Sequence, residues 1–292
     1  MSVMSNEVFQ HLSSLASLIP ETNLKENALN LLEQMNEVIE GVGDRPITWM
    51  PTMAKVIQGT TNVDSLQDGG APITPGTLVF GNTTAANGKK VIPLNLWQSR
   101  SFWEKGDESS RKICNSPDAK LGWKYGECNK CDYSIGDVGS PPPCNKEYTF
   151  IALDADFSNI YMLRFHKMGY RGGMDWQKEI TQSRTHPFKR IFELHGQSSE
   201  KRKTVKEIRA KLASGNCISA KEYSPEAMAF LEALYKRQVD DRSAFLAHFR
   251  ETTQARLMSR HDGDSGRAIE HIGEDDTVAP SETDSESTDY KY

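Results

Sequence analysis

Residues 114–144 read CNSPDAKLGWKYGECNKCDYSIGDVGSPPPC, and this stretch holds four of the five cysteines of the chain. The spacing is C-x13-C-x2-C-x12-C, a C-x-x-C pair with a single cysteine at a similar distance on either side. Four thiolates at about 2.3 Å satisfy tetrahedral Zn²⁺ and leave no open position, so a metal here would be structural. The stretch is rich in turn-forming residues and needs a cross-link to hold one shape. We therefore predict a zinc lobe over residues 112–146, with structural Zn²⁺ held by Cys114, Cys128, Cys131 and Cys144.

Two other uses of these thiols stay open at this stage. The first is a pair of disulfides, but the chain opens MSVMS with no secretory signal, and cytosolic proteins rarely keep disulfides. The second is a redox C-x-x-C, which normally opens a helix after a strand, whereas Asn129-Lys130 lies among turn-forming residues. Cys217 stands apart, and we predict a lone, partly buried thiol there. We expect a cytoplasmic protein.

Outward from this segment, the chain predicts an α+β fold. Apolar residues recur at helical intervals over 8–19 and 24–39, which predicts an N-terminal helical hairpin over residues 1–43. Short β-leaning runs follow at 47–49, 55–58, 77–80, 90–97, 147–153 and 159–165, with an Asn-Gly hairpin tip within 82–89. This spacing predicts an OB-like antiparallel β barrel over residues 44–195, with the four-cysteine zinc lobe inserted in it.

The C-terminal part is predicted to be helical over residues 196–261. It contains a basic amphipathic run at 201–213 and a long helix from Ser224-Pro225 to about Met258, with 240–242 as the place where that helix would break. Residues 262–292 hold ten acids and two bases and almost no aliphatic residues, so we predict a disordered acidic tail. Such a tail either keeps the protein soluble or binds partners or the protein's own basic surface.

Catalytic motifs are absent from the sequence, and we predict that the protein is not an enzyme. There is no P-loop, no dinucleotide-binding glycine motif, no nucleophile elbow and no HExxH. Asp154 and Asp156 could form a metal pair, but a solvated hairpin loop explains them as well and is favoured. No apolar run approaches the 18 residues of a membrane helix, so no membrane contact is expected.

Basic and aromatic residues are interleaved in the middle of the chain, where residues 97–211 hold 21 Lys and Arg against 15 Asp and Glu. Cations that follow phosphates and rings that stack on unpaired bases are what single-stranded nucleic acid requires. The rings on 147–153 and 159–165 could instead belong to a buried core and not to a DNA-binding surface. Residues 166–173 are predicted to form a flexible basic turn that can bind a nucleic-acid backbone. The residues predicted to contact nucleic acid are Trp97, Arg100, Trp103, Lys105, Arg111, Lys112, Trp123, Lys124, Tyr125, Tyr161, Arg164, Lys167, Tyr170 and Arg171.

This order of parts resembles single-stranded-DNA-binding proteins of tailed bacteriophages, including the type that also assists early transcription. The resemblance covers about residues 45–180, is most specific from Ile113 to Cys144, and includes the acidic end at 274–289. It implies an OB-like barrel that coats exposed strands in viral DNA replication and recombination. It also implies a tail that contacts replication proteins or RNA polymerase, although the end Tyr290-Lys291-Tyr292 departs from the bacterial pattern.

The leading hypothesis is therefore a sequence-tolerant single-stranded-DNA-binding protein. The alternatives are a transcription cofactor that binds host RNA polymerase, with DNA binding secondary, and a nuclease with a divergent site. Self-association through the N-terminal hairpin would make the protein a homo-oligomer.

Overall fold

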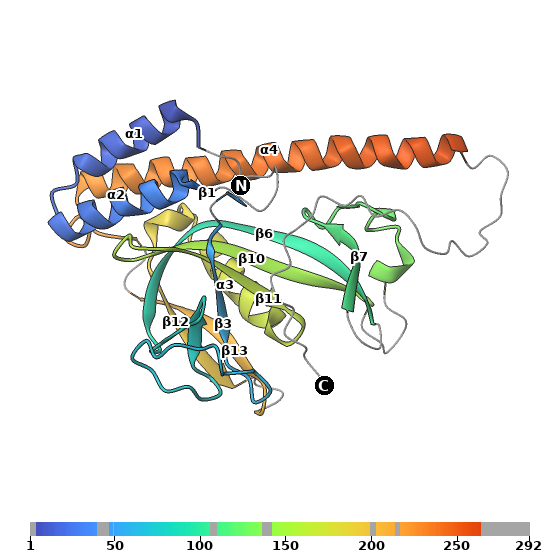
Figure 1. Ribbon diagram of the computed structural model, residues 1–292, viewed down its shortest axis with the longest axis horizontal. Coiled ribbons are helices and arrows are strands. Elements are labelled where there is room, and N and C mark those ends of the chain that lie inside the picture. Colours follow the sequence, from blue (N-terminus) through green and yellow to red (C-terminus); the bar gives the residue numbers. More distant parts are fainter. Residues whose placement is uncertain are drawn as a thin grey trace.

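The structure is a computed structural model, and it describes residues 4–39, 47–48, 50–105, 110–135, 142–198, 203–213 and 217–263 (Figure 1). The helices are α1 Asn6–Ser17, α2 Thr22–Asn36, α3 Tyr170–Gln182 and α4 Pro225–Gly263, with 3-10 turns η1 Asp132–Ser134, η2 Lys167–Gly169 and η3 Pro187–Lys189. The strands are β1 Val38–Ile39, β2 Ile47–Thr48, β3 Thr52–Val56, β4 Leu78–Phe80, β5 Thr83–Ala85, β6 Lys89–Lys105, β7 Ser110–Ser116, β8 Leu121–Gly122, β9 Gly126–Glu127, β10 Cys144–Asp154, β11 Ile160–His166, β12 Phe192–Ser198 and β13 Lys206–Leu212.

One large sheet dominates the described chain. Its order is β13-β12-β6-β10-β11-β3-β4-β5, and β7 pairs with the far half of β6. All neighbours are antiparallel except β11 and β3. The sheet curls into a half-barrel with helices against it (Figure 1). The α+β class is thus confirmed, and the curled sheet is compatible with an OB-like fold.

The side chain of Gln58 joins β13, an edge strand of the sheet, to the end of β3, an interior strand. Just beyond β3, its Nε2 donates to the Lys206 carbonyl oxygen at 2.7 Å, and its Oε1 accepts from the Lys206 N–H at 2.9 Å. Lys206 begins β13, which is an edge strand of the large sheet. The Gln58 amide therefore supplies the two hydrogen bonds that a neighbouring strand would otherwise give, and it shields this edge.

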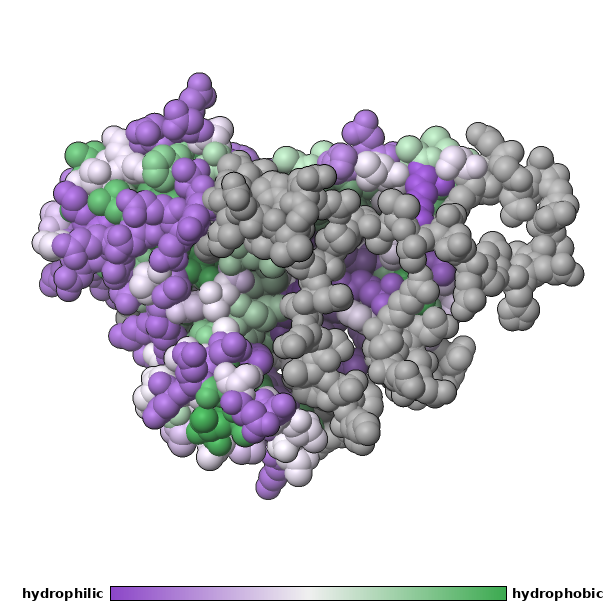
Figure 2. Space-filling model, viewed as in Figure 1, coloured by the Kyte–Doolittle hydropathy of each residue, from purple (hydrophilic) through white to green (hydrophobic). Residues whose placement is uncertain are grey.

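One face of the sheet is covered by α1, α2 and the first half of α4, and we call it the helix-layer face (Figure 1). The predicted N-terminal hairpin is α1 and α2. α4 starts as predicted, because Ser224 Oγ accepts from the Ala227 N–H at 3.2 Å and Pro225 is its first residue. Hydrophilic residues predominate on the outer surface of the helices at the upper left of Figure 2. The core under this layer includes Leu12, Leu31, Leu94, Ile151 and Phe230.

The opposite, concave face is filled by α3, and we call it the α3 face. The Trp176 ring stacks on Phe150 at 4.1 Å between ring centroids, and Phe165 and Phe192 meet Trp176 edge-on. The rings of β10 and β11 on this face are therefore core. Tyr161 is only 5% exposed, so its predicted role as a ring that stacks on bases is wrong.

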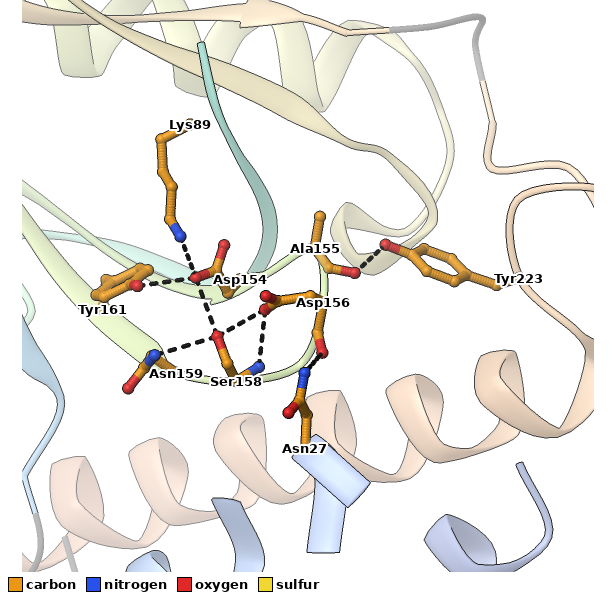
Figure 3. Close-up of polar contacts among 9 residues, drawn as sticks. All are labelled: Asn27, Lys89, Asp154, Ala155, Asp156, Ser158, Asn159, Tyr161 and Tyr223. Atoms are coloured by element: carbon orange, nitrogen blue, oxygen red, sulfur yellow. Dashed lines mark hydrogen bonds and ion pairs between the residues drawn. The ribbon is translucent and has the colours of Figure 1, made fainter. Parts of the chain in front are cut away.

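The hairpin loop between β10 and β11 is present as predicted, but Asp154 is buried and not solvated (Figure 3). Its Oδ2 accepts from Tyr161 Oη at 2.9 Å and from Ser158 Oγ at 3.2 Å, and it pairs with Lys89 Nζ. Burial raises the pKa of the Asp154 carboxyl, and Lys89 opposes this shift. Three donors on one oxygen give this carboxylate a structural role.

The same loop fastens the helix layer to the sheet. Asn27 of α2 donates its Nδ2 to the Asp156 carbonyl oxygen at 2.7 Å, and the Tyr223 hydroxyl donates to the Ala155 carbonyl oxygen (Figure 3). The loop is therefore a joint between two layers of the fold.

Several expectations about local structure are wrong. Residues 206–212 form strand β13 and not a helix, and 192–198 form β12, so the sheet extends into the predicted C-terminal helical region. The predicted turn at 166–173 is η2 followed by the start of α3. α4 continues through 240–242 without a break and ends at Gly263. Asn87-Gly88 forms a turn, with a φ of 90° at Gly88, but β5 and β6 do not pair across it; the turn that joins paired strands is Gly81-Asn82, between β4 and β5.

The rest of the predicted acidic tail, residues 264–292, lies outside the described residues. Within the described ranges, no helix has the length and apolar character needed to cross a membrane.

Candidate nucleic-acid interface and cysteine lobe

The far ends of β6, β10 and β11 lie beyond α1 and α2, and their two faces carry different sets of the predicted residues (Figure 1). Residues paired across strands share a face. The pairs Trp97–Thr149 and Thr149–Arg164 therefore place Trp97 and Arg164 together on the helix-layer face. Alternation along β6 puts Ser99, Ser101 and Trp103 on this face as well. Two of the predicted tryptophans and one predicted cation thus share one surface.

Trp103 is held at the end of this surface by polar contacts. Its Nε1 donates to Ser101 Oγ at 3.1 Å, and Ser101 Oγ in turn donates to Glu147. Lys112 of β7 faces Trp103 across the strand pair, and its Nζ lies 5.0 Å from the ring centroid. The Trp103 side chain remains 40% exposed. An anchored but exposed ring beside a cation is suited to stacking.

Trp97 contacts a cation that was not among the residues predicted to bind nucleic acid. The guanidinium of Arg242 on α4 lies 4.3 Å from the Trp97 ring centroid, and its Nη2 donates to the Pro117 carbonyl oxygen. Burial lowers the pKa of Arg242 to about 10, so it remains charged at neutral pH. Arg242, Arg250 and Arg256 recur on one side of α4, and this helical periodicity is the signal that could have identified them.

The four predicted zinc ligands line one pocket on the α3 face. Cys114 comes from β7, Cys128 and Cys131 from the C-x-x-C after β9, and Cys144 from the start of β10. All four are free thiols, and all but Cys131 are buried. Residues far apart in the sequence therefore line the same pocket.

Hydrogen-bond donors are directed at two of these sulfurs. Backbone N–H groups of Lys124 and Tyr125 donate to Cys114, and Ser116, whose Oγ donates to Asp118 Oδ1 at 3.2 Å, lies beside Cys128. The guanidinium of Arg100 donates to Cys144. Burial raises the pKa of each of these thiols, for Cys144 to about 11, and the donors oppose that shift.

Gly122 leaves the space that the thiols occupy. A Cβ at this position would lie 2.9 Å from Cys114 Sγ and 3.8 Å from Cys128 Sγ. Four free thiols, donors directed at sulfur and a missing side chain fit a tetrathiolate metal site. As placed, however, no group of three or more His, Cys, Asp or Glu side chains in the described ranges could hold a metal ion.

Cys217 lies apart from this pocket. It is exposed, so the prediction of a partly buried thiol is wrong.

A second group of rings covers the mouth of the cysteine pocket. Phe102 stacks on Tyr133 at 4.6 Å between centroids, Tyr125 lies 4.9 Å from Tyr133, and Lys124 Nζ lies 5.4 Å from the Tyr125 ring. Burial raises the pKa of Tyr125 to about 12. Tyr133 is 40% exposed. These rings occupy the sheet face opposite Trp97 and Trp103.

The second half of α4 is fastened to the cysteine lobe. Arg250 donates from Nε and Nη2 to Asp118 Oδ2 at 3.0 and 2.9 Å, and Arg256 lies 5.4 Å from the Trp123 ring centroid. Asp118 Oδ1 also accepts from the Lys120 and Leu121 N–H groups, which shapes the turn after Cys114. The helix and the lobe therefore form one structural unit.

The structure thus divides the predicted nucleic-acid residues. Trp97, Trp103, Lys112 and Arg164 share the helix-layer face, whereas Arg100 points into the cysteine pocket. Lys124 and Tyr125 are exposed on the lobe, and Trp123 lies under Arg256. Tyr170 packs on Tyr148, Lys167 is exposed in η2, and Arg171 is exposed in the first turn of α3. The side chains of Lys105 and Arg111 lie outside the described residues.

Comparison with known proteins gave no match: no protein-family model, curated protein or solved structure matches this chain. The function of this chain is therefore inferred from the geometry of the two faces.

Proposed function

We propose that the protein binds single-stranded DNA without strong sequence preference, through the helix-layer face at the far end of the sheet. The observation that carries this proposal is the pair Trp97 and Trp103 on one face of β6. Six residues of strand separate their Cα atoms by about 20 Å. An extended strand can follow such a track, and each base stacked on a ring contributes about 1–3 kcal/mol.

Cations border the same track. Arg164 lies two strands away from Trp97 on this face, Lys112 flanks Trp103, and Arg242 lies against Trp97. On this face of β6 the residues between the two rings are Ser99 and Ser101, both buried, so Trp97 and Trp103 are the largest side chains of the strand on this face. Neutralising phosphates with such cations releases counterions, so binding should weaken steeply with salt.

We propose further that Cys114, Cys128, Cys131 and Cys144 hold a structural zinc ion. Zinc bound by four thiolates would cross-link β7, the C-x-x-C and β10 and supply no catalytic chemistry. Elemental analysis of the purified, reduced protein tests this directly. Gly122→Ala should lower zinc affinity, because its Cβ would lie too close to Cys114 Sγ. Zinc content below a tenth of an equivalent would contradict the site.

The DNA proposal is tested by titrating the full chain with oligo-dT and following tryptophan quenching. Trp103→Ala should weaken binding about 5- to 150-fold, the equivalent of about 1–3 kcal/mol for one stacked base. Arg164→Gln should weaken binding modestly and reduce the salt slope by about one.

Tyr133→Ala, an exposed ring on the opposite face, is the matched control and should leave affinity unchanged. A larger effect of Tyr133→Ala than of Trp103→Ala would move the interface to the lobe. No binding to oligo-dT at low salt, together with capture of RNA polymerase at high salt, would favour the transcription role instead.

A further inference from the structure

Arg100 was predicted to contact phosphate, and its position in the structure gives it a different role. On β6 it pairs with Lys146 of β10 and with Ser116 of β7, and it lies two residues from Phe102, which pairs with both Cys114 and Cys144. Its side chain therefore lies on the α3 face, between the strands that carry these two cysteines. The guanidinium is among the groups that line the cysteine pocket.

The guanidinium is fixed in this position by two contacts. Its Nη1 donates to the Ser134 carbonyl oxygen at 3.2 Å, and the side chain also donates to the Cys144 thiol. Ser134 belongs to η1, which directly follows Cys131. Arg100 thus connects β6, the turn after the C-x-x-C, and the first residue of β10.

The charge of the centre gives this contact its significance. Four thiolates around a divalent ion leave two net negative charges. The other donors directed at these sulfurs are the neutral backbone N–H groups of Lys124 and Tyr125, and the Lys124 ammonium acts on Cys114 only through its charge. Groups that hydrogen-bond metal ligands orient them and tune the metal, and losing one typically costs about 10- to 100-fold in metal affinity.

We infer that Arg100 is the counter-charge of the cysteine centre: it orients Cys144 and stabilises the tetrathiolate metal complex, and it does not bind DNA. This inference rests on the proposed zinc site, and it assigns Arg100 a positioning role. Arginine suits the position because its planar fork reaches the Ser134 carbonyl and the sulfur together, which a lysine ammonium does less well.

The experiment measures Zn²⁺ affinity of the reduced full-length protein by competition with a chromophoric chelator, with Co²⁺ spectra as a second readout. Arg100→Gln should weaken Zn²⁺ binding about 10- to 100-fold. It should keep the cobalt–thiolate charge-transfer band at saturating Co²⁺, because all four thiols remain. Arg100→Lys should recover part of the affinity, because the charge is kept.

Lys112→Gln is the matched control, because it removes a cation from a neighbouring strand on the opposite face. It should leave Zn²⁺ affinity unchanged. Oligo-dT titrations of the same variants provide the converse readout, in which Arg100→Gln in its zinc-loaded form should keep the wild-type salt slope.

The outcomes separate the two proposals. Zn²⁺ affinity of Arg100→Gln within about twofold of wild type, or a salt slope reduced by about one, overturns the role of Arg100 and leaves the zinc site standing. A wild-type protein that takes up neither Zn²⁺ nor Co²⁺ overturns both. If Arg100→Gln does not fold, Arg100→Lys carries the test: Zn²⁺ affinity within about 10-fold of wild type supports the counter-charge, and a loss of about 100-fold despite the retained charge overturns it.

Discussion

The contact between Asp118 and Arg250 predicts that the cysteine lobe and the second half of α4 are energetically coupled. Replacing Asp118 by Asn keeps an oxygen for the Lys120 and Leu121 N–H groups. It places an amide NH₂ opposite the Arg250 donors, so both charge-assisted hydrogen bonds are lost. Hydrogen bonds to charged groups contribute about 1.5–3 kcal/mol. The Arg250 side chain is half exposed, so screening reduces the coupling between the two side chains to about 1 kcal/mol.

We expect Asp118→Asn to lower the free energy of unfolding by about 2 kcal/mol and Arg250→Gln by about 1 kcal/mol. The double variant should be only slightly worse than Asp118→Asn, because the shared interaction is already lost. Urea unfolding measures these values, and hydrogen exchange over 242–263 should become faster in each variant. Lys236→Gln is the control, because it breaks an exposed pair with Glu232 on the same helix and should cost less than about 0.5 kcal/mol.

The same carboxylate predicts a pH dependence. Hydrogen bonds from the two backbone amides and from Arg250 outweigh the effect of burial and lower the pKa of Asp118 in the folded protein. In the unfolded chain an Asp titrates near about 3.9. The stabilisation is therefore fully present above this pH and is lost as pH falls through the lower, folded pKa.

The coupling between the cysteine lobe and α4 would be refuted if the effects of Asp118→Asn and Arg250→Gln were additive and hydrogen exchange in α4 were unchanged.

Three further predictions concern the sheet, the β10–β11 loop and the tail. Gln58→Ala should lower the free energy of unfolding by about 2 kcal/mol in urea denaturation, because it removes two hydrogen bonds to Lys206. The control, Gln10→Ala at an exposed position, should cost less than about 0.5 kcal/mol. Equal effects would show that the Gln58 amide does not stabilise the contact with β13. Tyr161→Phe should lower the free energy of unfolding by about 1–3 kcal/mol, because buried Asp154 loses a hydrogen-bond donor. It should leave oligo-dT affinity unchanged. Weaker DNA binding would mean that the Tyr161 ring is accessible to DNA. Deleting 262–292 removes ten acids and two bases and should tighten oligo-dT binding at low salt, with the difference shrinking as salt rises; unchanged or weaker binding would contradict competition by the tail.

The sequence predicted the elements whose signals are local. The N-terminal hairpin, the start of α4 and the β10–β11 hairpin all follow from apolar periodicity or from capping and turn residues. The four cysteines, grouped by their spacing in the sequence, line one pocket. In each case the pattern lies within a short stretch of chain.

The failures have a different physical origin. The run at 206–212 has helical periodicity, but its partners, β12 and Gln58, are remote in sequence, and pairing with them overrode the local preference. Tyr161 was predicted to be exposed because its strand face is aromatic. That face is covered by α3, whose glycine-rich start, with Gly172 and Gly173, read as a turn. Both glycines are needed there, since a Cβ on Gly173 would lie 2.7 Å from Phe165 Cβ.

Phe102 and Trp103 are neighbours in β6, yet one belongs to the cysteine pocket and the other to the opposite surface. A single inserted or deleted residue between Trp97 and Phe102 would exchange the two rings between faces, since side chains alternate along a strand. Homologues should therefore vary in the loops flanking β6 but keep the length of this strand. In an engineered variant, the loops at the two ends of β6 can be replaced, but the number of residues between Trp97 and Phe102 must stay the same.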